Sequence, residues 1–263
     1  MAKFFPMFSG SEGNATYIGT GVGGLLVDVG VSYKKIKDTL SFAEISISDI
    51  KAVLITHHHN DHIKGLKTFL KKHHVPLVAS RETVYALEFL QIINSEHPRI
   101  YIDEIEFAQF DDFKIKGIST SHDCNGSSCF TITLGQGQKV AVCTDLGVMS
   151  DAIKEGIKGS HLVMLESNHD PVMLRMGPYP AELKIRIASE KGHLPNAVCA
   201  ETLSELYKHG TSRFVLAHLS EQNNTPEKAA SATRSALMDK GAVEDEDYIL
   251  YVAKKEGNKV ISI

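Results

Sequence analysis

The composition of the 263-residue chain is that of an ordinary globular protein, with 43% hydrophobic and 23% charged residues. Its formal net charge of −4 excludes a general electrostatic attraction to nucleic acid, so an anionic substrate would need a local basic patch or a metal ion. The four cysteines form no CxxC pair, and no apolar run resembles a signal peptide or a membrane span. We therefore expect reduced thiols, a cytoplasmic location and no membrane partner.

The first half of the chain alternates short strands with helices. Strands are expected at residues 15–18 and 25–29, separated by a glycine-rich turn. A helix is expected next, because apolar residues recur at helical spacing from position 33 to position 43. The following elements are expected to be a buried strand at 52–56, a helix at 63–73, a strand at 75–79 and a helix through Val84, Leu87 and Leu90.

The second half repeats this alternation. Asn196 is predicted to cap a helix that ends at Gly210, and Thr225-Pro226 predicts the start of another. Residues 181–188 fit a strand by their alternation and a helix by their position after Pro180. Strands are expected at 113–118, 130–134, 139–144, 162–165, 214–219, 249–252 and 260–263, the second and third of them forming a hairpin.

This order of elements indicates an α/β protein. Since no linker, repeat or low-complexity segment interrupts the chain, we expect one continuous domain over residues 1–263. Two successive halves of strands and helices suggest two sheets packed face to face with helices outside. A single doubly wound sheet is equally compatible with the sequence order.

The strongest chemical signal is the segment THHHNDH at residues 56–62, directly after an expected strand. Alternate residues of an extended segment point the same way, so His57 and His59 can reach one ion. Asp61 and His62, on the turn into a helix, can face a second ion. Zinc takes imidazole and carboxylate ligands, which favours a metal centre over a His-rich surface loop. His58 points away from its neighbours and is not expected to be a ligand.

Three further candidate ligands follow expected strands elsewhere in the chain: His122, Asp145 and His218. Each taken alone is more often a turn or surface residue. Their common position at the carboxyl ends of strands, where ligands gather in α/β folds, favours all three together.

With these residues the chain resembles the metallo-β-lactamase superfamily. The resemblance rests on Asp28 in LLVDVG, the HxHxDH motif and the three further ligands, which occur in the family's order. It implies an αβ/βα four-layer sandwich of two mixed sheets with helices outside, and a dinuclear metal site in the cleft between the sheets. The implied roles are His57, His59 and His122 on one ion, Asp61, His62 and His218 on the other, Asp145 bridging, and Asp28 orienting ligands.

Further motifs are similar to those of the YycJ/WalJ family, bacterial relatives of tRNase Z and of the phosphonate-pathway phosphodiesterase. They are SGSEGN at 9–14, TDLG at 144–147, LESNHD at 165–170, GHLPN at 192–196 and AHLSEQNN at 217–224. β-Lactamase activity is not expected, because the antibiotic-hydrolysing members carry Cys where this chain has Asp145. The segment DCNGSSCF at 123–130 departs from the Pro-containing version of the family and could alter the rim of the cleft.

The resemblance implies a metal-dependent hydrolase of phosphodiester bonds, with DNA as the partner and 5′-to-3′ exonuclease activity. His and Asp ligands accept Zn²⁺ or Mn²⁺, and Fe²⁺ as well, so two such ions are the expected cofactors. Besides Asp61, the resemblance to tRNase Z suggests Glu166 and His193 as catalytic residues that protonate the leaving group. The alternative for this pair is a strand end and a helix cap.

Several polar residues near these motifs have two interpretations each. His169 is a candidate to support the site, and Asn14 either supports its floor or stabilises a turn. A phosphate-binding rim or a solvated face fits Arg175, Lys184 and Arg186 equally. The cysteines are interpreted as packing residues, and the absence of Trp argues against tight binding of single strands.

Two other functions are compatible with the HxHxDH motif. A thioesterase of the glyoxalase II type, or a lactonase, uses the same scaffold, but the Glu166 and His193 pair favours the phosphodiesterase. A non-catalytic metal-binding or partner-binding module is disfavoured by the complete set of ligands.

Overall fold

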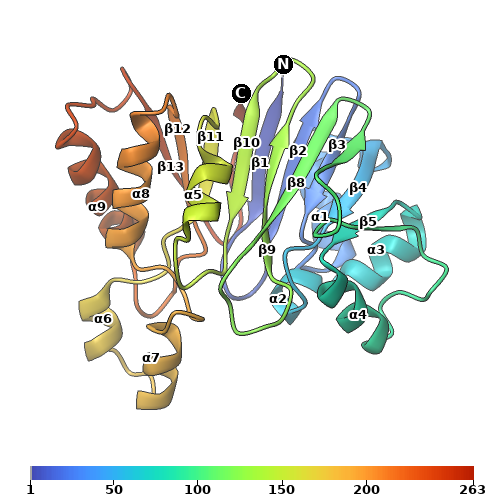
Figure 1. Cartoon of the computed structure of the whole chain (residues 1–263), viewed down its shortest axis with the longest axis horizontal. Helices are drawn as coiled ribbons and strands as arrows, with labels where there is room; N and C mark the ends of the chain where they lie inside the picture. Colours follow the sequence, from blue (N-terminus) through green and yellow to red (C-terminus); the bar gives the residue numbers. More distant parts are fainter. Residues whose placement is uncertain (1) are drawn as a thin grey trace. The chain divides into compact units, whose positions relative to one another are not determined.

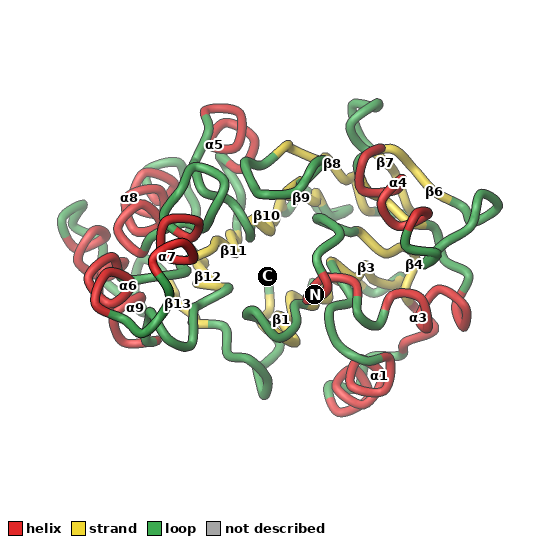
Figure 2. The backbone as a smooth tube through the Cα atoms, turned by 90° about the horizontal axis from the view of Figure 1, so that it is seen from below, coloured by secondary structure: helices red, strands yellow, loops and turns green. Residues whose placement is uncertain are grey.

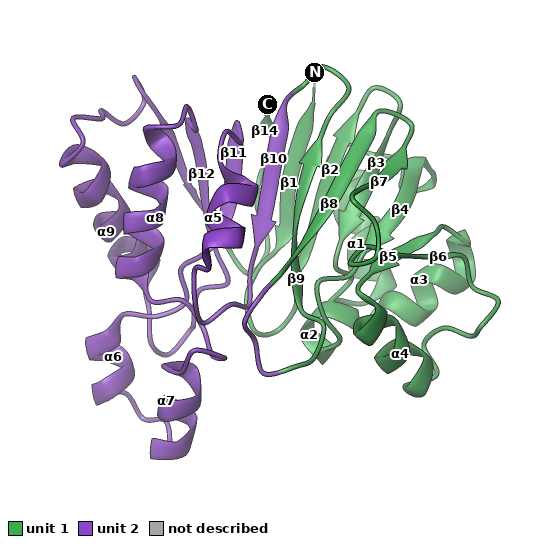
Figure 3. Ribbon diagram, viewed as in Figure 1, with its two compact units in different colours: residues 1–119, 124–137, 254–263 green, residues 120–123, 138–253 purple. Residues whose placement is uncertain are grey.

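The computed structural model describes residues 2–263, which divide into two compact units (Figure 3). Unit 1 comprises the described residues up to 119 together with 124–137 and 254–263, and unit 2 comprises 120–123 and 138–253. The expectation of one continuous domain stays a prediction, and each unit is described by itself. None of the helices within residues 2–263 is long and apolar enough to cross a membrane.

The strands form two seven-stranded sheets, in the orders β14-β1-β2-β3-β4-β5-β6 and β13-β12-β11-β10-β9-β8-β7. The first sheet lies wholly in unit 1, where β14, β1, β2 and β3 pair antiparallel and β3 to β6 pair parallel. Its strands are β1 (Lys3–Phe8), β2 (Ala15–Thr20), β3 (Gly23–Val27), β4 (Ile50–Leu54), β5 (Leu77–Ala79), β6 (Arg99–Tyr101) and β14 (Ile261–Ser262).

Three antiparallel strands of the second sheet also belong to unit 1: β7 (Ala108–Phe110), β8 (Phe113–Ser119) and β9 (Ser128–Thr133). The helices of this unit are α1 (Tyr33–Phe42), the 3-10 turn η1 (Ile47–Asp49), α2 (Asn60–Ile63), α3 (Leu66–His73) and α4 (Arg81–Phe89). Ile36 and Leu40 of α1 and Phe69 of α3 share one buried cluster with Leu26 and Val53 of the sheet. Burying each such side chain contributes about 1.5–3 kcal/mol, which fixes α1 and α3 against the sheet.

Unit 2 is built on four parallel strands: β10 (Lys139–Cys143), β11 (Leu162–Glu166), β12 (Arg213–Ala217) and β13 (Ile249–Val252). Its helices are α5 (Asp151–Ile157), α6 (Pro171–Met176), α7 (Ala181–Ile187), α8 (Asn196–Tyr207) and α9 (Pro226–Met238). Figure 2 shows α5, α8 and α9 over one face of these strands. Parallel strands place their carboxyl ends at one edge, and this edge carries the polar residues described below.

Most predicted elements are confirmed, and residues 181–188 are resolved in favour of a helix, α7. The prediction that Asn196 caps a helix is wrong: Asn196 is the first residue of α8, and Pro195 stands at the cap. The side chain of Asn196 instead accepts from Ser167 Oγ (2.7 Å) and donates to Asn224 Oδ1 (2.8 Å). The helix expected at 63–73 is two helices, α2 and α3, which meet around Gly65.

Candidate metal centre

The HxHxDH motif begins on the loop after β4 and runs into α2 in unit 1, so that Asp61 and His62 are residues of this short helix. His57 Nε2 lies 3.1 Å from His59 Nδ1, and the ring centroids of His57 and His62 are 4.1 Å apart. His57 and His62 are almost fully buried. The fold therefore gathers these three imidazoles, as the spacing of the motif predicts.

Asp28 and Thr56 fix the orientation of the imidazole rings through hydrogen bonds. Asp28 Oδ2 accepts a hydrogen bond from His62 Nδ1 at 2.8 Å, and both the backbone N–H and the hydroxyl of Thr56 donate to the Asp28 carboxylate. Burial raises the pKa of Asp28, while His62 and Thr56 act to lower it. A carboxylate on Nδ1 selects the tautomer of His62 that has its lone pair on Nε2, the form that binds metals.

Asn14 and Gly30 hold the other side of the motif. Asn14 Nδ2 lies 3.1 Å from His62 Nε2 and 3.3 Å from Asp61 Oδ2, and the Asn14 backbone N–H donates to Asp61 O. A Cβ atom on Gly30 would lie 1.7 Å from Asp61 O, so only glycine permits this close approach. Asn14 thus supports the site, in addition to accepting from the Gly10 backbone N–H within its own turn.

Cys124 is a residue that sequence reasoning assigned only to packing. Its Sγ lies within 4.8 Å of ring nitrogens of His57 and His59. The segment 123–130, which departs from the family's pattern, thus places a thiol beside two predicted ligands. A lone cysteine without CxxC spacing gives no sequence signal of such a position.

In unit 2, four potential ligands gather at the carboxyl ends of three neighbouring strands. Asp145 follows β10, Glu166 is the last residue of β11, and His218 follows β12. With His193, these residues each offer a ligand atom within 4.8 Å of the others. The common strand-end position predicted for Asp145 and His218 is thus present.

Glu166 is the hub of this cluster. Its Oε1 accepts from His193 Nδ1 (2.7 Å) and His218 Nδ1 (3.0 Å), while Oε2 accepts from the backbone N–H groups of Leu146 (3.0 Å) and Leu194 (3.4 Å). Full burial would raise the pKa of Glu166, but the charge and hydrogen bonds of His193 and His218 outweigh it and hold the pKa at about 2. Glu166 is therefore an ionised acceptor at neutral pH.

His193 is the exposed member of the pair with Glu166, with 22% of its side chain accessible against 0% for Glu166. Burial acts to lower the pKa of His193, but the carboxylates of Glu166 and Asp145 raise it overall. Since Nδ1 is bound to Glu166, Nε2 is the nitrogen left for other partners. Neither residue caps α8, so the interpretation of the pair as a strand end and a helix cap does not hold for His193.

His122 lies on the loop after β8, with Nδ1 3.2 Å from Gly192 O and Nε2 3.9 Å from Asp145 Oδ1. Of the basic residues considered for a rim, Arg186 pairs with Asp123, while Lys184 Nζ donates to Arg175 O (2.9 Å). Burial lowers the pKa of His169 and outweighs the negative charge of Glu166, which acts to raise that pKa. His169 lies nearly buried beside the loop that carries His193, because its backbone bridges to Pro195.

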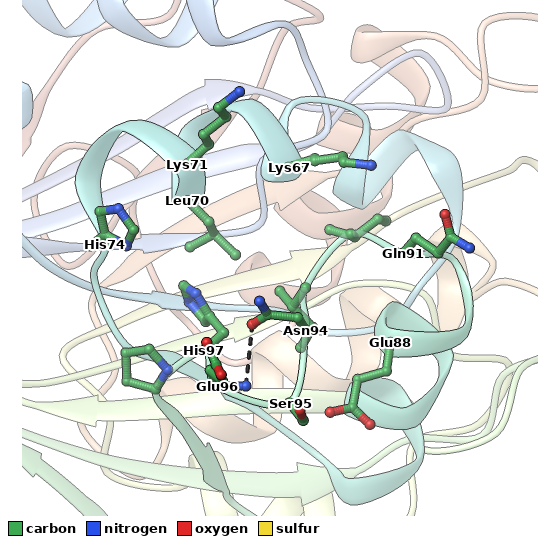
Figure 4. A pocket seen from close by; sticks show the side chains of 13 residues that line it. Lys67, Leu70, Lys71, His74, Glu88, Gln91, Asn94, Ser95, Glu96 and His97 are labelled. Atoms are coloured by element: carbon green, nitrogen blue, oxygen red, sulfur yellow. Dashed lines mark hydrogen bonds between the residues drawn. The ribbon is translucent and has the colours of Figure 1, made fainter.

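A pocket of unit 1 lies apart from these residues. It has a volume of about 820 Å³ and lies between α3, α4 and the segment 91–98 (Figure 4). Lys67, Lys71, Glu88 and Glu96 contribute both signs of charge to its wall. None of the predicted ligands lines this pocket, so its size does not mark it as the chemical site.

The donor chemistry of each unit fits a divalent cation. His62 and His218 both have Nδ1 held by a buried carboxylate, which leaves a lone pair on Nε2. That atom lies 3.4 Å from Asp61 Oδ2 for His62 and 3.5 Å from Asp145 Oδ1 for His218. A lone pair facing a carboxylate oxygen is unfavourable unless a cation or a proton stands between them. Imidazole and carboxylate ligands are those that Zn²⁺ and Mn²⁺ accept.

Comparison with known proteins identifies the family. A family model described as a beta-lactamase superfamily domain matches residues 25–219. The chain belongs to the metallo-β-lactamase superfamily. It is 38% identical to the exodeoxyribonuclease YycJ of Bacillus anthracis over 90% of each chain. It is also 34% identical to the exodeoxyribonuclease WalJ of Streptococcus pneumoniae, over 86% of this chain and 85% of the relative. The predicted kinship with the YycJ/WalJ family is confirmed.

Several solved structures share the fold. The metallo-beta-lactamase fold protein YhfI from Bacillus subtilis matches with a TM-score of 0.71 at 16% identity over 98% of each chain. Zn²⁺-bound PqqB from Methylobacterium extorquens also reaches 0.71, at 16% identity over 100% of each chain. Human tRNase Z, short form, matches with 0.64 at 17% identity, over 100% of this chain and 99% of the other. The predicted metallo-β-lactamase fold of two mixed sheets with helices is confirmed.

Proposed function

We propose that this metal-dependent hydrolase is a DNA exonuclease that cleaves phosphodiester bonds from the 5′ end. Two similarities support the substrate: the relatives at 38% and 34% identity are named exodeoxyribonucleases. The observation that carries the chemistry is the 2.7 Å contact between Glu166 Oε1 and His193 Nδ1, which gives the site a proton donor for a leaving oxygen.

The proposed metal ligands are those of the sequence prediction: His57, His59, Asp61 and His62 of unit 1, and His122, Asp145 and His218 of unit 2, holding two divalent ions such as Zn²⁺ or Mn²⁺. Divalent cations lower the pKa of water and neutralise charge on phosphate oxygens. Asp28 and Glu166 fix the tautomers of His62 and His218, so that both rings offer Nε2.

The remaining steps belong to residues of the chain. With Glu166 ionised, His193 is held with a proton on Nδ1, and its raised pKa favours the form in which Nε2 also carries a proton. In the proposed reaction Nε2 delivers that proton to the oxygen that leaves the phosphorus. The buried negative charge of Glu166 then favours reprotonation of the His193 ring. Solvent can supply the proton, because the edge of His193 is accessible.

The test is hydrolysis of DNA labelled at its 5′ or its 3′ end by protein supplied with Mn²⁺ or Zn²⁺. We expect the wild-type protein to release the 5′ label early, as a mononucleotide. The Asp61→Ala variant should not release it. Asp38→Ala, an exposed aspartate of α1, is the matched control. A thioester of the glyoxalase II type is assayed in parallel. Turnover of the thioester with no cleavage of DNA or of bis(p-nitrophenyl) phosphate would overturn the proposal.

A further inference from the structure

A small pocket lies between α6 and α7 in unit 2, the two helices that Figure 1 shows side by side. Its volume is about 380 Å³, at the small end of the range for pockets that bind small molecules. Its floor and walls are apolar, formed by Leu174, Ala181, Ile185 and Ala188. Ile185 is 71% exposed, so part of this apolar wall is open to a ligand from solvent.

The one buried polar group in this lining is the imidazole of His169. Only 3% of His169 is exposed, and its Nδ1 has no hydrogen-bond partner in the described structure. Burial lowers the pKa of His169, so the ring is neutral and Nδ1 can donate or accept a single hydrogen bond. A buried nitrogen without a partner is unfavourable, and a ligand that supplies the missing hydrogen bond would remove that cost.

The charged residues of the lining are both cationic, Arg175 and Lys184. Lys184 Nζ donates to Arg175 O, which keeps the ammonium at this rim. The occupant indicated by this lining is therefore flat or apolar, has one hydrogen-bonding edge and carries a negative charge beside it. A nucleotide has all three properties: a base with polar edge atoms and an adjacent phosphate.

The pocket is also connected to the proposed proton donor. His169 stands three residues after Glu166, and the Asn196 backbone N–H donates to His169 O at 2.9 Å. The Asn168 backbone N–H likewise donates to Leu194 O at 2.9 Å, so the segment carrying His193 is bonded along the segment carrying His169. A ligand held against His169 therefore lies on the framework that positions His193.

We infer that the α6–α7 pocket binds the base of the nucleotide at the end of the strand that is being cleaved. This inference rests on the proposed function and adds a substrate-positioning subsite to it. The base lies between the aliphatic side chains, a polar atom of its edge bonds His169 Nδ1, and Arg175 and Lys184 face its phosphate. A subsite for one base, rather than an aromatic platform for many, fits an enzyme that acts on ends.

The test measures binding of short oligodeoxythymidylates to the Mn²⁺-loaded protein by fluorescence anisotropy, with phosphorothioate linkages to slow cleavage. One oligonucleotide is intact, and in two others an abasic residue replaces the nucleotide at the 5′ or the 3′ end. We expect the intact strand to bind about tenfold more tightly than the strand that is abasic at the cleaved end. Equal affinities for all three strands would overturn the inference.

Three variants test whether the preference for the intact strand arises in the α6–α7 pocket. His169→Phe keeps a flat ring without Nδ1, and Ile185→Ser removes an apolar wall, so both should reduce the tenfold preference to about twofold. His169→Asn places a polar atom near the position of Nδ1 and should restore part of the preference. Met238→Ser, at an exposed apolar residue of α9, is the matched control for Ile185→Ser.

Failure of the inference and failure of the proposed function give different results. If the wild-type protein cleaves DNA but does not distinguish intact from abasic ends, only the base subsite is wrong. A preference that persists unchanged in His169→Phe and Ile185→Ser would assign base recognition to another surface and would also refute the subsite. If no DNA is cleaved or bound under any metal condition, the proposed function fails and the base subsite fails with it.

Discussion

Replacing Glu166 with Gln tests the central carboxylate most directly. Four donors converge on its two oxygens: two imidazole Nδ1 groups on Oε1 and two backbone N–H groups on Oε2. Glutamine has the same shape but only one oxygen. Whichever way its amide is turned, the NH₂ group meets two donors, so two buried hydrogen bonds are lost.

Each buried donor left without an acceptor costs about 1–3 kcal/mol, so Glu166→Gln should lower the free energy of unfolding by about 2–6 kcal/mol. With the average unfolding entropy per residue, this corresponds to a Tm lower by about 4–11 °C. The loss should depend on pH in a defined direction. Because the folded pKa of Glu166 is about 2, below its ordinary value of 4.5, its stabilising effect is complete above pH 4.5 and is lost as the pH falls towards 2.

The assay is thermal and urea unfolding of the metal-free wild type, Glu166→Gln and the control Glu155→Gln, an exposed glutamate of α5. The gap between wild type and Glu166→Gln should narrow from pH 6 to pH 3, while Glu155→Gln should stay within about 0.5 kcal/mol of wild type. In the proposed nuclease reaction, Glu166→Gln should lower kcat by about 10²–10⁴. A variant with unchanged Tm and with kcat within threefold of wild type would refute the role of Glu166 as the common hydrogen-bond acceptor of the cluster.

Three further predictions address the metal centre. Removing divalent ions with a chelator should lower Tm. If the free metal concentration was 100 times its Kd, the lost stabilisation is about 2.7 kcal/mol. Calorimetry of the stripped protein, before and after Zn²⁺ is added back, measures this loss. Asp28→Asn should weaken metal binding about 10–100-fold, because His62 loses the carboxylate that fixes its tautomer. Titration with a competing chelator measures the metal affinity, and an unchanged affinity would contradict the proposed role of Asp28. Gly30→Ala should destabilise the fold by about 1–3 kcal/mol, because the added Cβ meets Asp61 O, and urea unfolding measures the loss. Gly21→Ala is the control, because a Cβ atom there meets no atom within 4 Å, and an equal loss in both variants would contradict the clash.

The sequence predicted much of this site because its strongest signals are local. His57, His59 and His62 lie within one short segment, and the geometry of an extended chain brings them together whatever surrounds it. Glu166 and His193 are 27 residues apart, and their pairing was predicted only through the family resemblance. The structure supplies the physical reason: the segment that carries His193 is hydrogen-bonded along the end of β11, with the Leu194 backbone N–H donating to Glu166 Oε2 and the Asn168 backbone N–H donating to Leu194 O.

Other features could not be predicted because they depend on contacts between distant segments. The thiol of Cys124 reaches His57 and His59 only through the folding of a loop without periodicity. Asn196 has the residue type of a helix cap, but its side chain forms hydrogen bonds with Ser167 and Asn224 instead. β6, β7 and α6 have only three to six residues, too few for a hydrophobic period to be recognised.

The backbone at Asp28, Asp145 and His218 has φ angles of 62°, 59° and 54°, in the left-handed region that favours glycine. Each position follows a strand of the parallel arrays, and each carries a side chain of the proposed metal centre at a conformational cost of about 1–3 kcal/mol. Glycine would relieve this backbone strain, but at position 28 it would leave His62 and Thr56 without their buried acceptor. A relative with glycine at positions 145 and 218 would also lack two of the proposed metal ligands. The residue types at these three positions are therefore a simple sign, readable in any related sequence, of whether the proposed ions can be held.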